Sequence, residues 1–222
     1  MLYAVLSYRI IPLFRKEPPC FGAVKNRWVA VTGCTDGIGK ALVKELTKYG
    51  FEKFLLIARN HEKLVVLAEE LEQLGAKFSD RIVFDFGTDD FQRLMSEVRQ
   101  YDIGFLINNV GEAPASLQNF HCDEELNRRL FRVNTFSQIE MIHAVLPNMI
   151  NKKSGVVVNI ASITAQRPVP QLTSYGASKR AVMFLSLSLA DEYKSYGITF
   201  QCYMPFLVST KMTGYRMGGR MQ

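Results

Sequence analysis

Cysteine is scarce in this sequence, and its four copies are widely spread. No two of them form a C-x-x-C pair, and the three histidines show no ligand spacing. Structural zinc sites and disulfide frameworks both need closely patterned side chains, so the sequence argues against either and is typical of a reducing compartment. The residues concerned are Cys20, Cys34, Cys122, Cys202, His61, His121 and His143.

The sequence is also short of long hydrophobic runs. Its apolar start, residues 1–14, is below the length of about 20 residues that spans a bilayer, and it lacks the features of a signal peptide. Two interpretations remain. The run is either a membrane-surface helix or anchor end, with Arg15 and Lys16 keeping the rest of the chain on the cytosolic side, or an arm packed on the domain. We expect a membrane-associated N-terminal segment at 1–26 and one domain at 27–222.

Repeats, flexible linkers and basic blocks are missing as well. The net charge of +6 comes from scattered lysines and arginines without interleaved aromatic residues, which argues against nucleic-acid binding. A basic surface of this kind also suits anionic cofactors, acyl-CoA substrates or acidic lipid headgroups. Hydrophobic residues make up 48% of the 222 positions, enough for one α/β domain with a full core.

From residue 27 onward the apolar pattern alternates between strand and helix. Six nearly unbroken apolar strands imply a Rossmann-type, doubly wound parallel sheet with helices on both faces. Such a sheet binds its ligand at the carboxyl ends of the strands, at the switch point. The expected strands are 28–32, 54–57, 81–86, 103–107, 155–161 and 198–204, and the expected helices are 37–49, 61–74, 89–99, 122–149 and 175–196.

A glycine-rich turn follows the first expected strand and opens a helix. Gly33, Gly37 and Gly39 have the spacing G-x-x-x-G-x-G. Glycines there allow a tight turn and let backbone N–H groups reach a pyrophosphate at the positive end of the helix. The alternative is a plain strand-to-helix turn, but the position after the first strand favours a dinucleotide loop.

The end of the second strand bears on which dinucleotide binds. A carboxylate about 20 residues after the loop would hold a ribose 2′-hydroxyl, whereas an arginine accommodates a 2′-phosphate. The sequence there is Ala58-Arg59-Asn60, with no carboxylate, so Arg59 favours NADP(H). The alternative is a solvated arginine at a strand end.

Tyr175 and Lys179 lie four residues apart at the start of a long expected helix. This spacing puts phenol and ammonium on one face, where a cation lowers the phenol pKa from about 10 and allows proton exchange with a carbonyl oxygen. Such pairs also arise by chance, and Tyr49 with Lys53 is one to which we give no role. Ser162, after the fifth strand, can donate to a substrate carbonyl, although serines there are usually caps or turns.

Taken together, these stretches resemble the short-chain dehydrogenase/reductase family from about residue 27 to residue 210. The resemblance rests on several motifs in the family's order. They are Thr32-Gly33-x-x-x-Gly37-x-Gly39, Asn108-Asn109-x-Gly111, Ser162, Tyr175-x-x-x-Lys179, and Pro205 followed by Val208 and Thr210.

The resemblance implies specific roles. Tyr175 is the proton donor or acceptor, Lys179 lowers its pKa and holds the nicotinamide ribose, and Ser162 orients the substrate oxygen. Asn134 holds a water in the proton relay, and Asp85 contacts the adenine. The implied cofactor contacts are Gly33, Thr35, Gly37, Ile38, Gly39, Arg59, Asp85, Asn109, Tyr175, Lys179, Pro205 and Val208.

Finer features resemble the 17β-hydroxysteroid dehydrogenase type 3 and type 12 branch, which includes the very-long-chain 3-oxoacyl-CoA reductases. They are Thr35-Asp36-Gly37-Ile38-Gly39-Lys40, Val110, Glu192-Tyr193-Lys194 and the stretch Pro205 to Met212. This branch implies NADPH-dependent reduction of a lipid ketone, either a 17-ketosteroid or a 3-oxoacyl-CoA. It also implies an endoplasmic reticulum membrane location facing the cytosol, and a homodimer is compatible with it.

Two departures from the family pattern shape the expectations. The sequence ends at Gln222, where family members continue through a substrate-covering segment and a seventh strand. We therefore expect a shortened domain whose sixth strand is an edge, and a competing interpretation is a non-catalytic isoform that binds nucleotide or a partner. In addition, Asp36 stands where many NADPH-using relatives carry a basic residue, which leaves the selection to Arg59.

Overall fold

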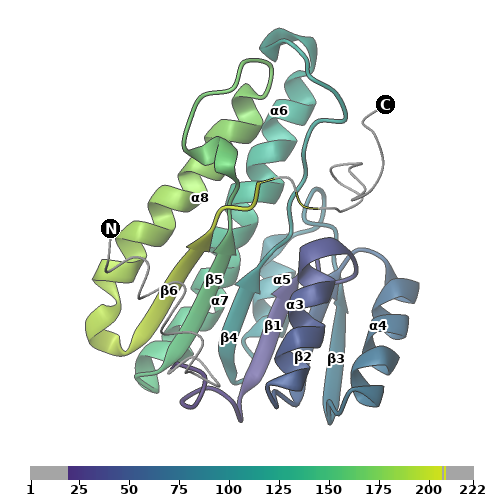
Figure 1. The fold of residues 1–222 in the computed structure, drawn as a ribbon, viewed down its shortest axis with the longest axis vertical. Coiled ribbons are helices and arrows are strands. Elements are labelled where there is room, and N and C mark those ends of the chain that lie inside the picture. The colour runs from purple at the N-terminus through teal and green to yellow at the C-terminus, as the bar shows by residue number, and fades with distance from the viewer. Residues whose placement is uncertain (1–19, 207, 209–222) are drawn as a thin grey trace.

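The computed structural model describes residues 20–206 and residue 208. Six strands form one parallel sheet in the order β3-β2-β1-β4-β5-β6. The order reverses between β1 and β4, so the predicted doubly wound architecture is confirmed (Figure 1). The strands are β1 (Trp28–Thr32), β2 (Lys53–Ala58), β3 (Phe78–Val83), β4 (Ile103–Asn108), β5 (Gly155–Ile160) and β6 (Ile198–Tyr203).

Helices cover both faces of the sheet, and each face has its own core. Alternate residues of β1 point in opposite directions, so Val29 and Val31 pack on one side while Ala30 packs on the other. The first side is covered by α3 (Gly37–Lys48) and α4 (His61–Gln73). The second side is covered by α5 (Phe91–Val98), α7 (Ser137–Asn151) and α8 (Thr173–Glu192), and α6 (Glu124–Phe131) leads into α7 (Figure 1).

Three elements differ from the sequence prediction. The helix expected at 175–196 ends at Glu192, and a separate 3₁₀ turn covers Lys194–Tyr196. The third strand was expected at 81–86 but runs Phe78–Val83, because it pairs residue by residue with β2 from Lys53↔Phe78 to Ala58↔Val83. Phe84 follows the strand and is buried in the core instead. The single helix expected at 122–149 is divided by a π-helical turn, Arg132–Phe136, between α6 and α7.

The start of the described chain packs on the domain. Val24 is 1% exposed, and the ring of Phe21 meets that of Phe51 edge-on at 5.1 Å between centroids. Residues 1–19 of the predicted N-terminal segment lie outside the described residues. Within the described part, no helix is both long and apolar enough to cross a membrane.

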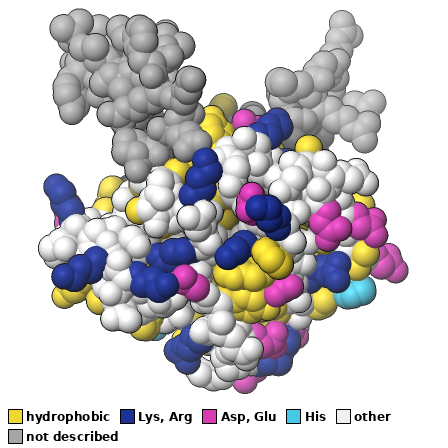
Figure 2. Space-filling model, turned by 90° about the horizontal axis from the view of Figure 1, so that it is seen from below, with side chains coloured by type: hydrophobic (Ala, Val, Ile, Leu, Met, Phe, Trp, Pro, Cys, Tyr) yellow, Lys and Arg dark blue, Asp and Glu magenta, His cyan; other side chains and the backbone are white. Residues whose placement is uncertain are grey.

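The surface seen from the amino ends of the strands mixes charges of both signs. Figure 2 shows lysine and arginine side chains interspersed with aspartate, glutamate and apolar groups across this face. At one edge of the sheet, β6 pairs with β5 through six registered residues and has no other strand beside it among those described. The expected edge is therefore present in the described part of the chain.

Candidate active site

The glycine-rich turn lies between the carboxyl ends of β2 and β4. Gly33 has φ +63°, and its N–H donates to Ile57 O at 2.8 Å. A Cβ atom at Gly33 would lie 2.9 Å from Val110 Cα, so only glycine fits this close approach. Asp36 then caps α3, its Oδ1 accepting from Gly37 N at 2.9 Å. The predicted loop residues Thr35, Ile38 and Gly39 continue this turn into the helix.

Two side chains tie the turn to β4. Asn109 Nδ2 donates to Thr32 O and Gly33 O, at 3.1 and 2.9 Å. In return, Thr32 Oγ1 accepts from the N–H groups of Asn109 and Val110, both at 3.0 Å. The predicted cofactor contact of Asn109 stays a prediction, because its amide is bonded to the loop here. Thr32 opens the motif on which the family resemblance rests, and the structure adds that it positions the turn through these two bonds.

Ser162 and Tyr175 come together, although they belong to different elements. Ser162 follows β5 and is 8% exposed, and Tyr175 lies in the first turn of α8. Their side chains share a hydrogen bond. Beside them, Pro205 O accepts from Ile163 N at 3.0 Å, which holds the segment after β6 against the segment after β5.

The side chains of Lys179 and Asn134 both lie next to Gly111. A Cβ atom at Gly111 would lie 3.1 Å from Lys179 Nζ and 3.3 Å from Asn134 Oδ1. Lys179 is 4% exposed and donates to Ile160 O at 3.0 Å. Ser178 links this group to Tyr175, since Ser178 Oγ accepts from Asn134 Nδ2 at 3.1 Å and donates to Tyr175 O at 2.8 Å. All four residues predicted to be catalytic are thus in one cluster.

The protonation equilibria differ from the expectation. Burial lowers the pKa of Lys179 to about 8, because the charged ammonium loses its hydration inside the protein. Burial also raises the pKa of Tyr175, and the hydrogen bond with Ser162 offsets this only in part. The prediction that the phenol pKa lies below its ordinary value is therefore wrong for the protein without nucleotide. Desolvation of the phenolate outweighs any stabilisation of its charge.

The π-helical turn presents Asn134 to the cluster. Asn134 is fully buried, its Oδ1 accepts from Glu112 N at 2.8 Å, and its Nδ2 donates to Glu112 O at 2.9 Å. Thr135 Oγ1 adds a bond to Ser178 O at 3.1 Å. Single π-turns inside helices are frequent at functional sites, and this one joins the loop after β4 to α8. A water held by Asn134 stays a prediction.

The remaining predicted residues follow the carboxyl ends of the strands, at the same end of the sheet as the cluster. Arg59 is exposed directly after β2, and Val208 is 37% exposed beyond β6. Asp85 Oδ1 accepts from Gly87 N at 2.8 Å. Arg129 of α6, which the sequence pattern does not single out, lies 3.7 Å from Asp85 Oδ1 and donates to Glu112 Oε2 at 2.8 Å. It therefore connects the predicted adenine contact with the loop after β4.

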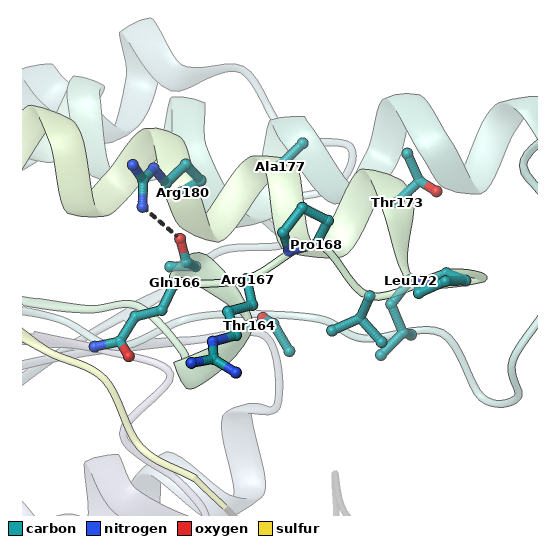
Figure 3. Close-up of a pocket in the computed structure, with 12 residues that line it drawn as sticks. Thr164, Gln166, Arg167, Pro168, Leu172, Thr173, Ala177 and Arg180 are labelled. Atoms are coloured by element: carbon teal, nitrogen blue, oxygen red, sulfur yellow. Dashed lines mark hydrogen bonds between the residues drawn. The ribbon is translucent and has the colours of Figure 1, made fainter.

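A cavity of about 580 Å³ adjoins the segment after Ser162. Figure 3 shows its walls, which come from residues 164–170 and from the first turns of α8. Apolar groups, including Pro168 and Leu172, supply much of the lining. Arg180 of α8 lines it and donates to Ala165 O at 3.0 Å, the dashed line in Figure 3. An apolar hollow thus flanks the segments that carry Ser162 and Tyr175.

Known proteins are similar to this chain in sequence. A family model described as short chain dehydrogenase matches residues 27–218. The chain is 42% identical over 192 residues to the very-long-chain 3-oxoacyl-CoA reductase of Anas platyrhynchos, covering 84% of this chain and 61% of that protein. It is 38% identical over 191 residues to the inactive hydroxysteroid dehydrogenase-like protein 1 of Homo sapiens, covering 85% and 58%. The chain thus spans about six tenths of the length of these relatives.

Solved structures agree on the fold. A short-chain dehydrogenase from Sphingobium yanoikuyae in complex with NADPH superposes with a TM-score of 0.79 at 29% identity. The match covers 85% of this chain and 74% of that one. The two proteins therefore share a fold over most of this chain.

Proposed function

The chain belongs to the short-chain dehydrogenase family, and on that premise we propose that it reduces a lipid ketone to the alcohol with NADPH, or catalyses the reverse oxidation. One observation carries this proposal. The hydrogen-bonded pair Ser162–Tyr175 lies with buried Lys179 and Asn134 in one cluster, at the sheet edge where the glycine-rich turn opens.

The described residues fit an adenine dinucleotide. The turn from Gly33 to Gly37 wraps the amino end of α3, where backbone N–H groups and the helix dipole favour a pyrophosphate. Arg59 stands after β2 in place of a carboxylate, which favours the 2′-phosphate of NADP(H). The Sphingobium neighbour, whose structure contains NADPH, supports the same choice. Asp85 is proposed to face the adenine.

When bound, the dihydronicotinamide supplies hydride to the carbonyl carbon of the substrate. The hydroxyl of Ser162 donates a hydrogen bond to the carbonyl oxygen and fixes its position. Tyr175 gives its phenolic proton to the same oxygen as negative charge develops there, completing the alcohol. Because the pKa of Lys179 is lowered to about 8, its ammonium can exchange protons near neutral pH, and it would return a proton to the phenolate through a relay in which Asn134 holds a water.

The substrate class is argued from the relatives and the cavity. The relatives include a very-long-chain 3-oxoacyl-CoA reductase and an inactive hydroxysteroid dehydrogenase-like protein. An apolar cavity beside the segment after Ser162 suits a lipid chain or a steroid ring. We therefore propose a 3-oxoacyl-CoA or a 17-ketosteroid as substrate, at the cytosolic side of the endoplasmic reticulum membrane.

The competing function is nucleotide or partner binding without turnover. It is not favoured, because a binding protein has no need for Ser162, Tyr175 and Lys179 in this arrangement. The two functions separate cleanly in an assay of the full chain. We expect oxidation of NADPH, with formation of the matching alcohol, on adding either a 3-oxoacyl-CoA or a 17-ketosteroid. NADPH binding without alcohol formation from either ketone would establish the competing function.

A further inference from the structure

Thr164 lies two residues after Ser162, in the 3₁₀ turn Ile163–Ala165 that follows β5. The two residues are joined directly, because Thr164 N donates to Ser162 Oγ at 3.2 Å. The turn also lies against the start of α8, since a Cβ atom at Gly176 would come 3.6 Å from Thr164 O. Thr164 is therefore a close neighbour of Ser162 and Tyr175, the pair proposed to act on the ketone oxygen.

The side-chain hydroxyl of Thr164 is buried, and it has no hydrogen-bond partner among the described residues. A buried hydroxyl without a partner costs free energy, because it has lost its bonds to water. A ligand that supplies the missing bond removes this cost. Thr164 lies in the wall of the cavity of about 580 Å³ that adjoins the active site (Figure 3). A rotation into another staggered χ1 rotamer exchanges its methyl and hydroxyl groups, so the hydroxyl can face a ligand in this cavity.

Positive charge borders the same cavity. Arg167 and Arg180 line it, and no aspartate or glutamate does so among the described residues. Apolar side chains, including Val169 and Leu172, form much of the remaining wall. This combination suits a substrate that joins an apolar chain to phosphate groups, as an acyl-CoA does, better than it suits a neutral steroid.

We propose that Thr164 is a specificity-determining residue, whose hydroxyl donates a hydrogen bond to the thioester carbonyl of a 3-oxoacyl substrate. The inference rests on the proposed function. In such a substrate one carbon atom separates the ketone from the thioester carbonyl, so the two oxygens can lie side by side. When the ketone oxygen meets Ser162 and Tyr175, the thioester oxygen is held close to the neighbouring Thr164. A 17-ketosteroid has no carbonyl beside its ketone, and it leaves this hydroxyl without a partner.

The test compares a 3-oxoacyl-CoA with its thioether analogue, in which a CH₂ group replaces the thioester C=O. NADPH oxidation by the full chain gives kcat/KM for each ketone. Thr164→Val keeps the shape of the side chain and removes its hydroxyl. For this variant we expect kcat/KM to fall about tenfold with the thioester and to change less than about twofold with the thioether, because only the thioester offers the second oxygen. Thr164→Ser retains the hydroxyl and should keep the wild-type preference.

Thr199→Val is the matched control. Thr199 is half-buried like Thr164, but it lies near the amino end of β6, away from the cavity. Its replacement should leave both kcat/KM values unchanged. Equal losses for the two ketones in Thr164→Val, or no loss for either, would overturn the role of Thr164. So would a wild-type chain that reduces a 17-ketosteroid but no 3-oxoacyl-CoA, although the proposed function would then stand. A wild-type chain that reduces neither would remove the proposed function, and this inference with it.

Discussion

Lys179 shows how the site is arranged at the scale of single residues. Its ammonium is almost completely buried and bonded to Ile160 O at 3.0 Å. Burial lowers its pKa from the ordinary 10.5 to about 8, because a charged amine loses hydration in the interior. The folded protein therefore binds this proton less tightly than the unfolded chain does. The ammonium charge is available to the reaction. At pH values below about 8, however, the folded protein carries this buried charge, which lowers its free energy of unfolding.

Lys179→Met should make this cost measurable. Between about pH 8 and pH 10 the unfolded chain keeps the Lys179 proton while the folded protein has released it, so wild-type stability gains up to about 1.4 kcal/mol per pH unit from this group. The variant cannot show this gain. Urea titrations at several pH values give the free energy of unfolding of each protein. The wild-type value minus the variant value should rise by up to about 1.4 kcal/mol per pH unit between about pH 8 and pH 10.

Comparing the two proteins removes titrations that do not interact with Lys179, which excludes Cys202, because its thiolate and the Lys179 charge shift each other's pKa. Burial raises the pKa of Cys34 to about 12, so this thiol destabilises the folded protein increasingly as pH rises above its ordinary value. That contribution is the same in both proteins and cancels. A constant difference across the range would contradict the lowered pKa of Lys179.

The residue scale also shows what the sequence could reveal. Tyr175 and Lys179 were found from their spacing, and Ser162 from its place after a strand. The positioning bonds of Thr32 and Ser178 do not follow from the sequence pattern, because they join segments 77 and 44 residues away. The spacing with Lys179 predicts a lowered pKa for Tyr175, whereas burial raises it. Burial depends on how the whole chain packs, so the local sequence does not reveal it.

At the scale of elements, the π-helical turn is the feature that the apolar pattern did not predict. The helical period continues through 122–149, and the departure from it is set by contacts of Asn134 with Glu112 and Ser178. The sheet was easier to predict, because buried parallel strands are apolar along their whole length. The third strand, at the edge, carries exposed polar residues, and its bounds were three residues off.

Asn134→Ala should therefore destabilise the fold as well as the site. It leaves the part-buried N–H and C=O of Glu112 without their side-chain partner, which we expect to cost about 2–3 kcal/mol of unfolding free energy. Ser178→Ala keeps both Glu112 bonds and should cost only about 1 kcal/mol. Chemical denaturation of the two variants measures this difference. Equal effects would mean that the turn does not depend on Asn134.

For the whole molecule, the outer face of α8 suggests self-association. Phe184 and Leu187 lie three residues apart on one face of the helix and are 68% and 58% exposed. Monomeric proteins rarely leave such neighbouring large apolar groups in water without a partner. We expect this face to bury itself in a homodimer, whereas the catalytic cluster lies on the inward face of the same helix.

Phe184→Glu should shift the protein from dimer to monomer in sedimentation velocity, because a carboxylate cannot be buried in an apolar interface without a large desolvation penalty. Val66→Glu provides the control, since Val66 is an exposed apolar residue on the outer side of α4, at 50% exposure. It should leave the oligomeric state unchanged. A wild-type protein that sediments as a monomer at every concentration would rule out this interface.

The central claim is that Tyr175 protonates a ketone oxygen while the nucleotide delivers hydride. The most direct measurement follows deuterium from deuterated NADPH into the alcohol product, in the wild type and in Tyr175→Phe. We expect label transfer by the wild type and a loss of at least about a hundredfold in the variant, with NADPH affinity retained, because only the acidic proton is removed. Label transfer by Tyr175→Phe at a tenth or more of the wild-type rate would contradict the claim.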